Sequence, residues 1–139
     1  MASPDGNEPI ADDELLYRRI PASTNWYSEA VLSPMAFRPH GERDVDGISL
    51  WRAKHTSIDQ AARGRPGKEY YVAVLRAGDL AAHGIEVTAT PKRGEPGHAS
   101  LPALNSENRR DPAALDLQGL LAGQLTVRVE GPFRTPDSS

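Results

Sequence analysis

The apolar run Tyr70-Tyr71-Val72-Ala73-Val74-Leu75 is the strongest strand signal in this 139-residue chain. All six residues are apolar or aromatic, and two of them are β-branched. An uninterrupted run of this length is typical of a strand that is covered on both faces, because a strand with one solvated face alternates instead. We therefore expect the domain to be organised around a buried strand at residues 70–75.

Other strands are predicted on both sides of this run. Residues 85–89 and 125–129 alternate between apolar and polar side chains, as half-buried strands do. Residues 48–52 form a third candidate, in which Ser49 and Trp51 lie on the opposite face from their apolar neighbours. Residues 15–20 fit a strand or a short helix, and the strand is favoured because the following proline holds its neighbour in extended geometry.

Helix signals are few and short. Ser57 and Gln60 have the spacing of a capping box, and residues 79–83 form one helical turn before a glycine. Asp111 caps a helix with proline at its first position and an apolar leucine stripe, which we expect to end at Gly123. The strand that follows should stop at a Gly-Pro pair, residues 131–132.

The order of these elements predicts an α+β fold. We expect a small mixed or antiparallel sheet of four to five short strands, with two to three short helices largely on one face. The chain length suits one domain, which we place at residues 12–133. Residues 1–11 and 134–139 are polar and rich in proline, glycine or serine, so we expect a disordered leader and a disordered tail.

Composition restricts the function classes. The chain has no cysteine, so disulfides, thiolate metal sites and cysteine nucleophiles are excluded. Its formal net charge is −3, which argues against nucleic-acid binding, since that function usually requires a basic surface. No signal sequence or membrane-spanning run is recognisable, so we expect a soluble, cytoplasmic protein without a membrane partner.

Two loops have partial motifs that fail on inspection. Residues 64–68 end in Gly-Lys, as a phosphate-binding P-loop does, but Glu69 replaces the hydroxyl residue and a strand follows where a helix is needed. Residues 42–47 have the acidic character of a calcium loop, but Ala53 stands where the bidentate carboxylate belongs. The four histidines have no metal-ligand spacing, and we expect no metal and no cofactor.

One cluster of basic residues could bind an anion. If residues 16–20 form a strand, the guanidinium groups of neighbouring arginines point to opposite faces, and one of them must find a carboxylate or a ligand. A structural carboxylate partner from Asp44, Asp46 or Glu69 is the simpler interpretation. The functional interpretation is a small anion pocket, whose candidate ligand-binding residues are Arg18, Arg19, Arg52 and His98.

The segment Leu16-Tyr17-Arg18, with Ser33 further on, resembles ADP-ribosyltransferase-like proteins, which open with an arginine or histidine on their first strand. The resemblance implies a nucleotide-binding enzyme. Its spacing departs from the family pattern and no matching catalytic glutamate follows, so we assign no family.

The apolar segment between residues 22 and 39 suggests a different function. Its candidate partner-binding residues are Trp26, Tyr27, Met35 and Phe37, which would form a docking patch if they were exposed. The first hypothesis is therefore a non-catalytic interaction module that acts through a protein partner or as a homo-oligomer. The alternative is a small enzyme or nucleotide-binding domain with an Arg/His anion pocket, and the sequence leaves open whether the protein is an enzyme.

Overall fold

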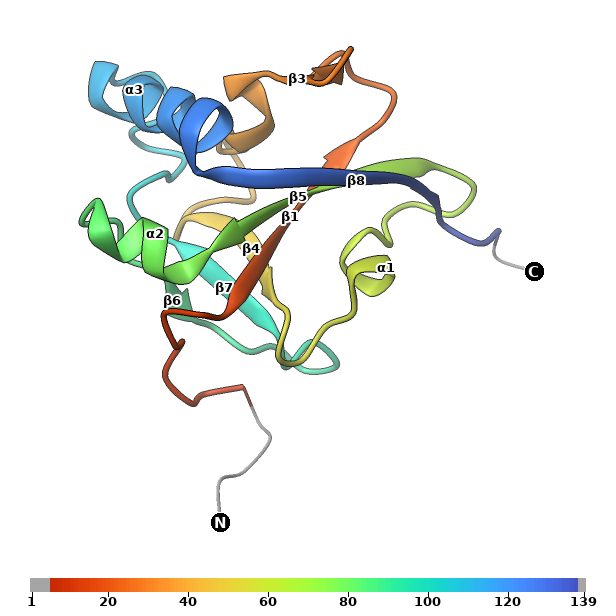
Figure 1. The fold of residues 1–139 in the computed structure, drawn as a ribbon, viewed down its shortest axis with the longest axis horizontal. Coiled ribbons are helices and arrows are strands. Elements are labelled where there is room, and N and C mark those ends of the chain that lie inside the picture. The colour runs from red at the N-terminus through yellow and green to blue at the C-terminus, as the bar shows by residue number, and fades with distance from the viewer. Residues whose placement is uncertain (1–5, 138–139) are drawn as a thin grey trace.

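A six-stranded antiparallel sheet forms the centre of the computed structural model, which describes residues 6–137 (Figure 1). The strand order is β6-β7-β4-β1-β5-β8. In chain order these strands are β1 (Leu15–Pro21), β4 (Ile48–Arg52), β5 (Glu69–Arg76), β6 (Thr88–Ala89), β7 (His98–Leu101) and β8 (Thr126–Arg134). The α+β class is confirmed, with more strands than the sequence predicts.

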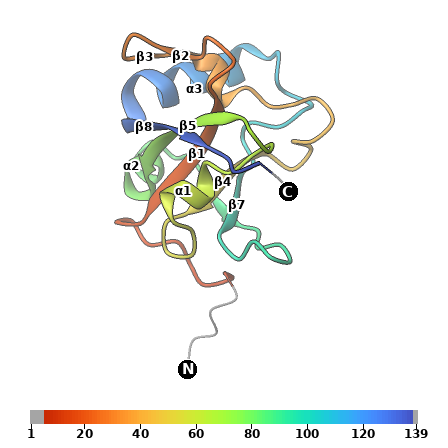
Figure 2. The same ribbon diagram turned by 90° about the vertical axis from the view of Figure 1, so that its right-hand side faces the viewer.

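The remaining elements surround this sheet. A separate hairpin pairs β2 (Tyr27–Ser28) with β3 (Val31–Leu32), and a 3-10 turn, η1 (Pro34–Phe37), follows it. The helices are α1 (Ile58–Ala61), α2 (Ala77–Ala82) and α3 (Pro112–Leu120), which continues into a π-helical turn, η2 (Leu121–Leu125). Figure 2 shows the hairpin beside α3 at one end of the molecule. Among the described residues, no helix has the length and apolar character needed to cross a bilayer.

The predicted buried strand is β5. It pairs with β1 on one side and β8 on the other, and its residues 72–75 are all buried. Side chains on the two faces of the sheet pack into two separate hydrophobic cores. Leu16 and Ile20 belong to the main core under α2 and α3, and Tyr17 and Trp51 belong to a smaller core against α1. This placement on both faces explains why β5 is apolar without interruption.

Several local predictions are confirmed. The strand at residues 48–52 has the expected bounds, residues 15–20 form a strand, and Ser57 and Gln60 make both bonds of the capping box. Two predictions are wrong in extent. Among residues 85–89, only Thr88 and Ala89 pair with a neighbouring strand. The strand β8 does not stop at Gly131-Pro132 but continues to Arg134, because a shift of register opposite Tyr70 accommodates the Gly-Pro sequence. The expected end of α3 at Gly123 is also wrong, since η2 carries the turn on to Leu125.

The position of β4 determines where a cleft opens. β1 pairs with β5 along its whole length but with β4 only at Leu16 and Tyr17. Beyond Tyr17 the two strands separate, while Ile48 to Trp51 of β4 pair with β7 on the other side. Arg18 and Arg19 are the first two residues after this split.

Arg52 anchors the segment that precedes β1. Its guanidinium is 0% exposed, pairs with the carboxylate of Glu14 (Nε–Oε2, 2.8 Å) and donates to the carbonyl oxygens of Gly6, Glu8 and Pro9. The hydrogen bond to Glu14 raises the pKa of Arg52. Residues 6–9 thus contact the folded unit. The division into leader, domain and tail stays a prediction, and its residues 1–5 and 138–139 lie outside the described part of the chain.

The carboxylate of Glu8 links the same segment to His55, and this contact predicts a pH dependence. The hydrogen bond to His55 lowers the pKa of Glu8 from 4.5 to about 2. A carboxylate with a depressed folded-state pKa stabilises the fold above its unfolded pKa and loses that contribution as the pH falls toward the folded one. We expect Glu8→Gln to flatten the acid limb of stability between about pH 4.5 and pH 2. Urea unfolding across that range measures the change, and an unaltered acid limb would contradict this role of Glu8.

Candidate functional site

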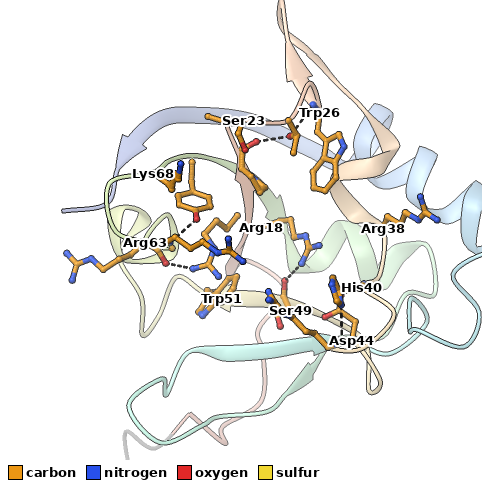
Figure 3. Close-up of a pocket in the computed structure, with 18 of the residues that line it drawn as sticks. Arg18, Ser23, Trp26, Arg38, His40, Asp44, Ser49, Trp51, Arg63 and Lys68 are labelled. Atoms are coloured by element: carbon orange, nitrogen blue, oxygen red, sulfur yellow. Dashed lines mark hydrogen bonds between the residues drawn. The ribbon is translucent and has the colours of Figure 1, made fainter. Parts of the chain in front are cut away.

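A cleft of about 1570 Å³ opens where β1 and β4 separate (Figure 3). Segments far apart in the sequence form its walls: the strand residues Arg18 and Ser49, the loop before β4, the loop before β5, and the turn before β7. Arg63 and Lys68 lie on one side of Arg18 in Figure 3, and Arg38, His40 and Asp44 lie on the other. The volume exceeds the roughly 300–1,000 Å³ of ordinary ligand pockets, so the cleft has room for a ligand of nucleotide size.

The charge of the cleft is opposite to that of the chain as a whole. Among the described residues, ten Lys and Arg side chains line it, whereas three Asp and Glu side chains do, namely Asp44, Glu69 and Glu95. A concave surface lined by one sign of charge focuses the electrostatic potential and raises the local concentration of counter-ions. The cleft therefore attracts anions although the protein is net acidic.

Arg18 bridges the gap at the split. Its Nε donates to the carbonyl oxygen of Ala36 (2.9 Å) and its Nη1 donates to that of Ser49 (3.0 Å). Within residues 6–137 no carboxylate lies within ion-pair distance of it. Burial lowers the pKa of Arg18 from 12.5 to about 10, with Asp44 as the opposing charge. The guanidinium is thus charged at neutral pH, held in place by neutral acceptors, and available to an anion.

Arg19 points to the opposite face, as the alternation of a strand requires. Its guanidinium carbon lies 4.7 Å from the ring centroid of Trp51 and 5.6 Å from that of Tyr70, and Nη1 donates to the carbonyl of Arg63. Burial lowers the pKa of Arg19. Like Arg18, it has no ion-pair partner among the described carboxylates. The stacked rings hold this second cation at the cleft wall.

The loop at residues 64–68 lines the cleft but does not act as a P-loop. Its backbone N–H groups are occupied: those of Gly64 and Gly67 donate to Thr135, and that of Arg65 donates to the hydroxyl of Tyr70. The loop can therefore meet an anion only through its cationic side chains. This agrees with the rejection of the motif from sequence.

A hydrogen-bonded chain of polar side chains crosses the sheet beneath the cleft. Ser49 Oγ lies 2.9 Å from His98 Nε2, and His98 Nδ1 lies 3.1 Å from the carbonyl oxygen and 2.9 Å from the hydroxyl of Thr90. The Thr90 hydroxyl in turn contacts Ser100 (2.9 Å). His98 is buried in β7 and packs edge-on against Trp51. Burial lowers the pKa of His98, which favours the neutral imidazole.

Three of the four predicted ligand-binding residues line this cleft. Arg18, Arg19 and His98 do so from two strands. Arg52 does not: it lies at the other end of β4 and is satisfied by Glu14, a partner that differs from the three carboxylates expected from sequence.

The predicted partner-binding residues do not form one exposed patch. Phe37 is 0% exposed in the main core, and Tyr27 packs edge-on against Tyr71. Trp26 and Met35 are half-buried and line the cleft. Within residues 22–39, the large apolar side chain that is exposed is that of Val31, with 68% of its surface accessible.

Sequence reasoning missed most of the cleft wall, including Arg38, Ser49, Arg63 and Arg109. One signal was available for Ser49, because a serine that alternates with Trp51 opposite an apolar face calls for a polar neighbour. The loop arginines gave no such signal, because charged loop residues are usually solvated.

Within residues 6–137, no group of three or more His, Asp or Glu side chains is arranged to hold a metal ion. Comparison of the chain with protein-family models, with curated proteins and with solved structures finds no match.

Proposed function

We propose that the protein binds a phosphate-bearing ligand of nucleotide size in the cleft between β1 and β4. The observation that carries the proposal is the pair Arg18 and Arg19, two partly buried guanidinium groups that have neutral acceptors and, within residues 6–137, no ion-pair carboxylate. Guanidinium groups match phosphate oxygens in bidentate geometry.

The energetics of Arg18 support this proposal. Moving a charge out of water is costly unless a partner of opposite charge compensates. The lowered pKa of Arg18 reflects that cost. A bound phosphate would supply the missing charge, and the ligand would then stabilise the fold by mass action.

The aromatic side chains favour a ligand with a flat ring. Trp26 is half-buried and lines the same cleft as Arg18 (Figure 3). An indole face offers stacking to a base, while the ten cations of the wall offer contacts to its phosphates. This combination favours a nucleotide over a free inorganic anion.

Calorimetric titration with ATP, AMP, adenosine and inorganic phosphate tests the proposal. We expect ATP and AMP to bind and to raise the melting temperature, with adenosine binding at least about tenfold more weakly, because each charge-assisted hydrogen bond contributes roughly 1.5–3 kcal/mol. Raising the ionic strength from about 0.05 M to 0.3 M should weaken ATP binding, since salt screens the charges of an open cleft.

The outcomes separate the candidate ligands. If inorganic phosphate binds as tightly as AMP, the site recognises only the phosphate group and not the nucleoside. Absence of binding by all four compounds at low salt would overturn the proposal.

A protein partner remains the second candidate function. The observation that favours it is the protruding β2–β3 hairpin with Val31 exposed at its end. Light scattering of wild type and Val31→Ser checks for self-association, and identical monomer masses would count against a homo-oligomer. A cytoplasmic location likewise stays a prediction.

A further inference from the structure

Ser49 and His98 form a hydrogen-bonded pair inside the anion-attracting cleft. They stand on the adjacent strands β4 and β7, both line the cleft, and Ser49 is the more exposed of the two. The Oγ–Nε2 distance is 2.9 Å. A nucleophile within hydrogen-bond reach of a base that a third group orients is the arrangement that activates serine in covalent catalysis.

The neighbours of His98 determine where its proton lies. The carbonyl oxygen of Thr90 lies 3.1 Å from Nδ1 and can only accept, whereas the Thr90 hydroxyl, 2.9 Å from Nδ1, can accept as well if it donates its own proton to Ser100. A proton on Nδ1 is the tautomer that satisfies both oxygens. In the neutral ring Nε2 then has a free lone pair, and the Ser49 hydroxyl donates to it. Thr90 therefore orients the imidazole so that its basic nitrogen faces the serine.

Arg18 places a positive charge beside this pair. Its Nη1 donates to the backbone carbonyl of Ser49 itself, and no described protein acceptor engages Nη2. A guanidinium fixed next to a nucleophile can hold an anionic group of the substrate or the oxyanion that forms during attack.

We propose that Ser49 is a catalytic nucleophile, that His98 is its general base, and that the cleft hydrolyses carboxylic esters that bear an anionic group such as a phosphate. The anionic group in this substrate class rests on the proposed function, whereas the nucleophile does not.

The reaction needs only water as co-reactant. Ser49 Oγ bonds to the ester carbonyl carbon, its proton passes to His98 Nε2, and the carbonyl electrons move to the oxyanion. The carbonyl re-forms as the bond to the leaving oxygen breaks, and that oxygen takes the proton from Nε2. Water then attacks the acyl-serine by the same route, which releases the acid and returns the proton to Ser49.

Several charged groups act on the base. Burial lowers the pKa of His98 below 6.5, Lys92 adds to this effect, and Glu95 and Asp44 oppose it together with the Thr90 hydrogen bond. The neutral, basic form is therefore present at pH 7. Nucleophilic reactivity should fall as the pH drops through the folded-state pKa, which lies below 6.5.

Diisopropyl fluorophosphate tests the nucleophile in the full-length protein. This neutral reagent forms an Oγ–P bond, releases fluoride and needs no anion site, so its reaction does not depend on the proposed ligand. We expect one adduct by intact mass, mapped to Ser49 by peptide sequencing. His98→Asn should slow labelling by about 100-fold or more, because general-base catalysis contributes 10²–10⁴-fold.

Ser28→Ala is the matched control, since Ser28 is an exposed serine that does not line the cleft, and labelling of this variant should equal that of wild type. The pH profile of wild-type labelling provides a measurement that does not depend on a variant folding. The absence of an adduct at Ser49 in the folded wild type would overturn the catalytic pair. A labelling rate that changes neither in His98→Asn nor on acidification below pH 6.5 would overturn it as well.

Ester hydrolysis distinguishes this proposal from the anion site. We expect p-nitrophenyl succinate, an anionic ester, to be cleaved faster than p-nitrophenyl acetate, and Arg18→Met to remove the difference. Labelling of Ser49 without that preference would keep the nucleophile and reject the anionic substrate class. Nucleotide binding without labelling of Ser49 would support the proposed ligand site and reject the catalytic pair.

Discussion

Replacing Arg52 with methionine is expected to lower the free energy of unfolding by about 3–5 kcal/mol, because it leaves Glu14 as an uncompensated buried carboxylate. The variant also removes the donors to three carbonyl oxygens of residues 6–9. Urea denaturation followed by tryptophan fluorescence measures the loss. Arg52→Lys restores the charge without the forked geometry, so we expect intermediate stability.

Arg76→Met is the matched control for this experiment. Arg76 pairs with Asp79 at the surface, where both side chains are about half exposed. An exposed ion pair is worth about 0–1 kcal/mol. Equal losses for the two variants would contradict the anchoring role of Arg52.

Arg18→Met should have the opposite pattern, with little loss of stability and a large loss of binding. Methionine removes a charge whose burial is unfavourable, and water in the open cleft can satisfy the carbonyls of Ala36 and Ser49. We therefore expect a stability change within about 1 kcal/mol. Affinity for ATP should fall by about 10–150-fold, since one or more charge-assisted bonds worth roughly 1.5–3 kcal/mol are lost.

Thermal unfolding and calorimetry on the same preparation separate these two effects. Arg76→Met again serves as control, because it removes a cation that does not line the cleft. Should Arg18→Met unfold the protein, or bind ATP as wild type does, then Arg18 is part of the scaffold and the proposed site loses its central residue.

Local patterns in the sequence predict much of the secondary structure. The capping box at Ser57 depends on residues three positions apart, and the buried strand at residues 70–75 is a continuous apolar run. The alternation of Arg18 and Arg19 between faces also follows from strand geometry alone. Such features are predictable because the interacting groups are neighbours in the chain.

The extent of the neighbouring strands explains the elements that were predicted wrongly. Residues 85–89 alternate well, but only Thr88 and Ala89 meet a partner strand, β7. β8 passes through Gly131-Pro132 because β5 offers it a partner there, with a shift of register to accommodate the pair. In both cases the presence of a neighbouring strand, not the propensity of the segment, sets the length.

Local patterns are sufficient to predict the α+β class and the buried strand β5, and they single out Arg18, Arg19 and His98 as candidate anion ligands. The pairing of Arg52 with Glu14 and of Ser49 with His98 is established by the three-dimensional fold. Those partners stand 38 and 49 residues apart in the chain. Strand order and the separation of β1 from β4 bring them together, and these depend on long-range pairing that no local window of sequence contains.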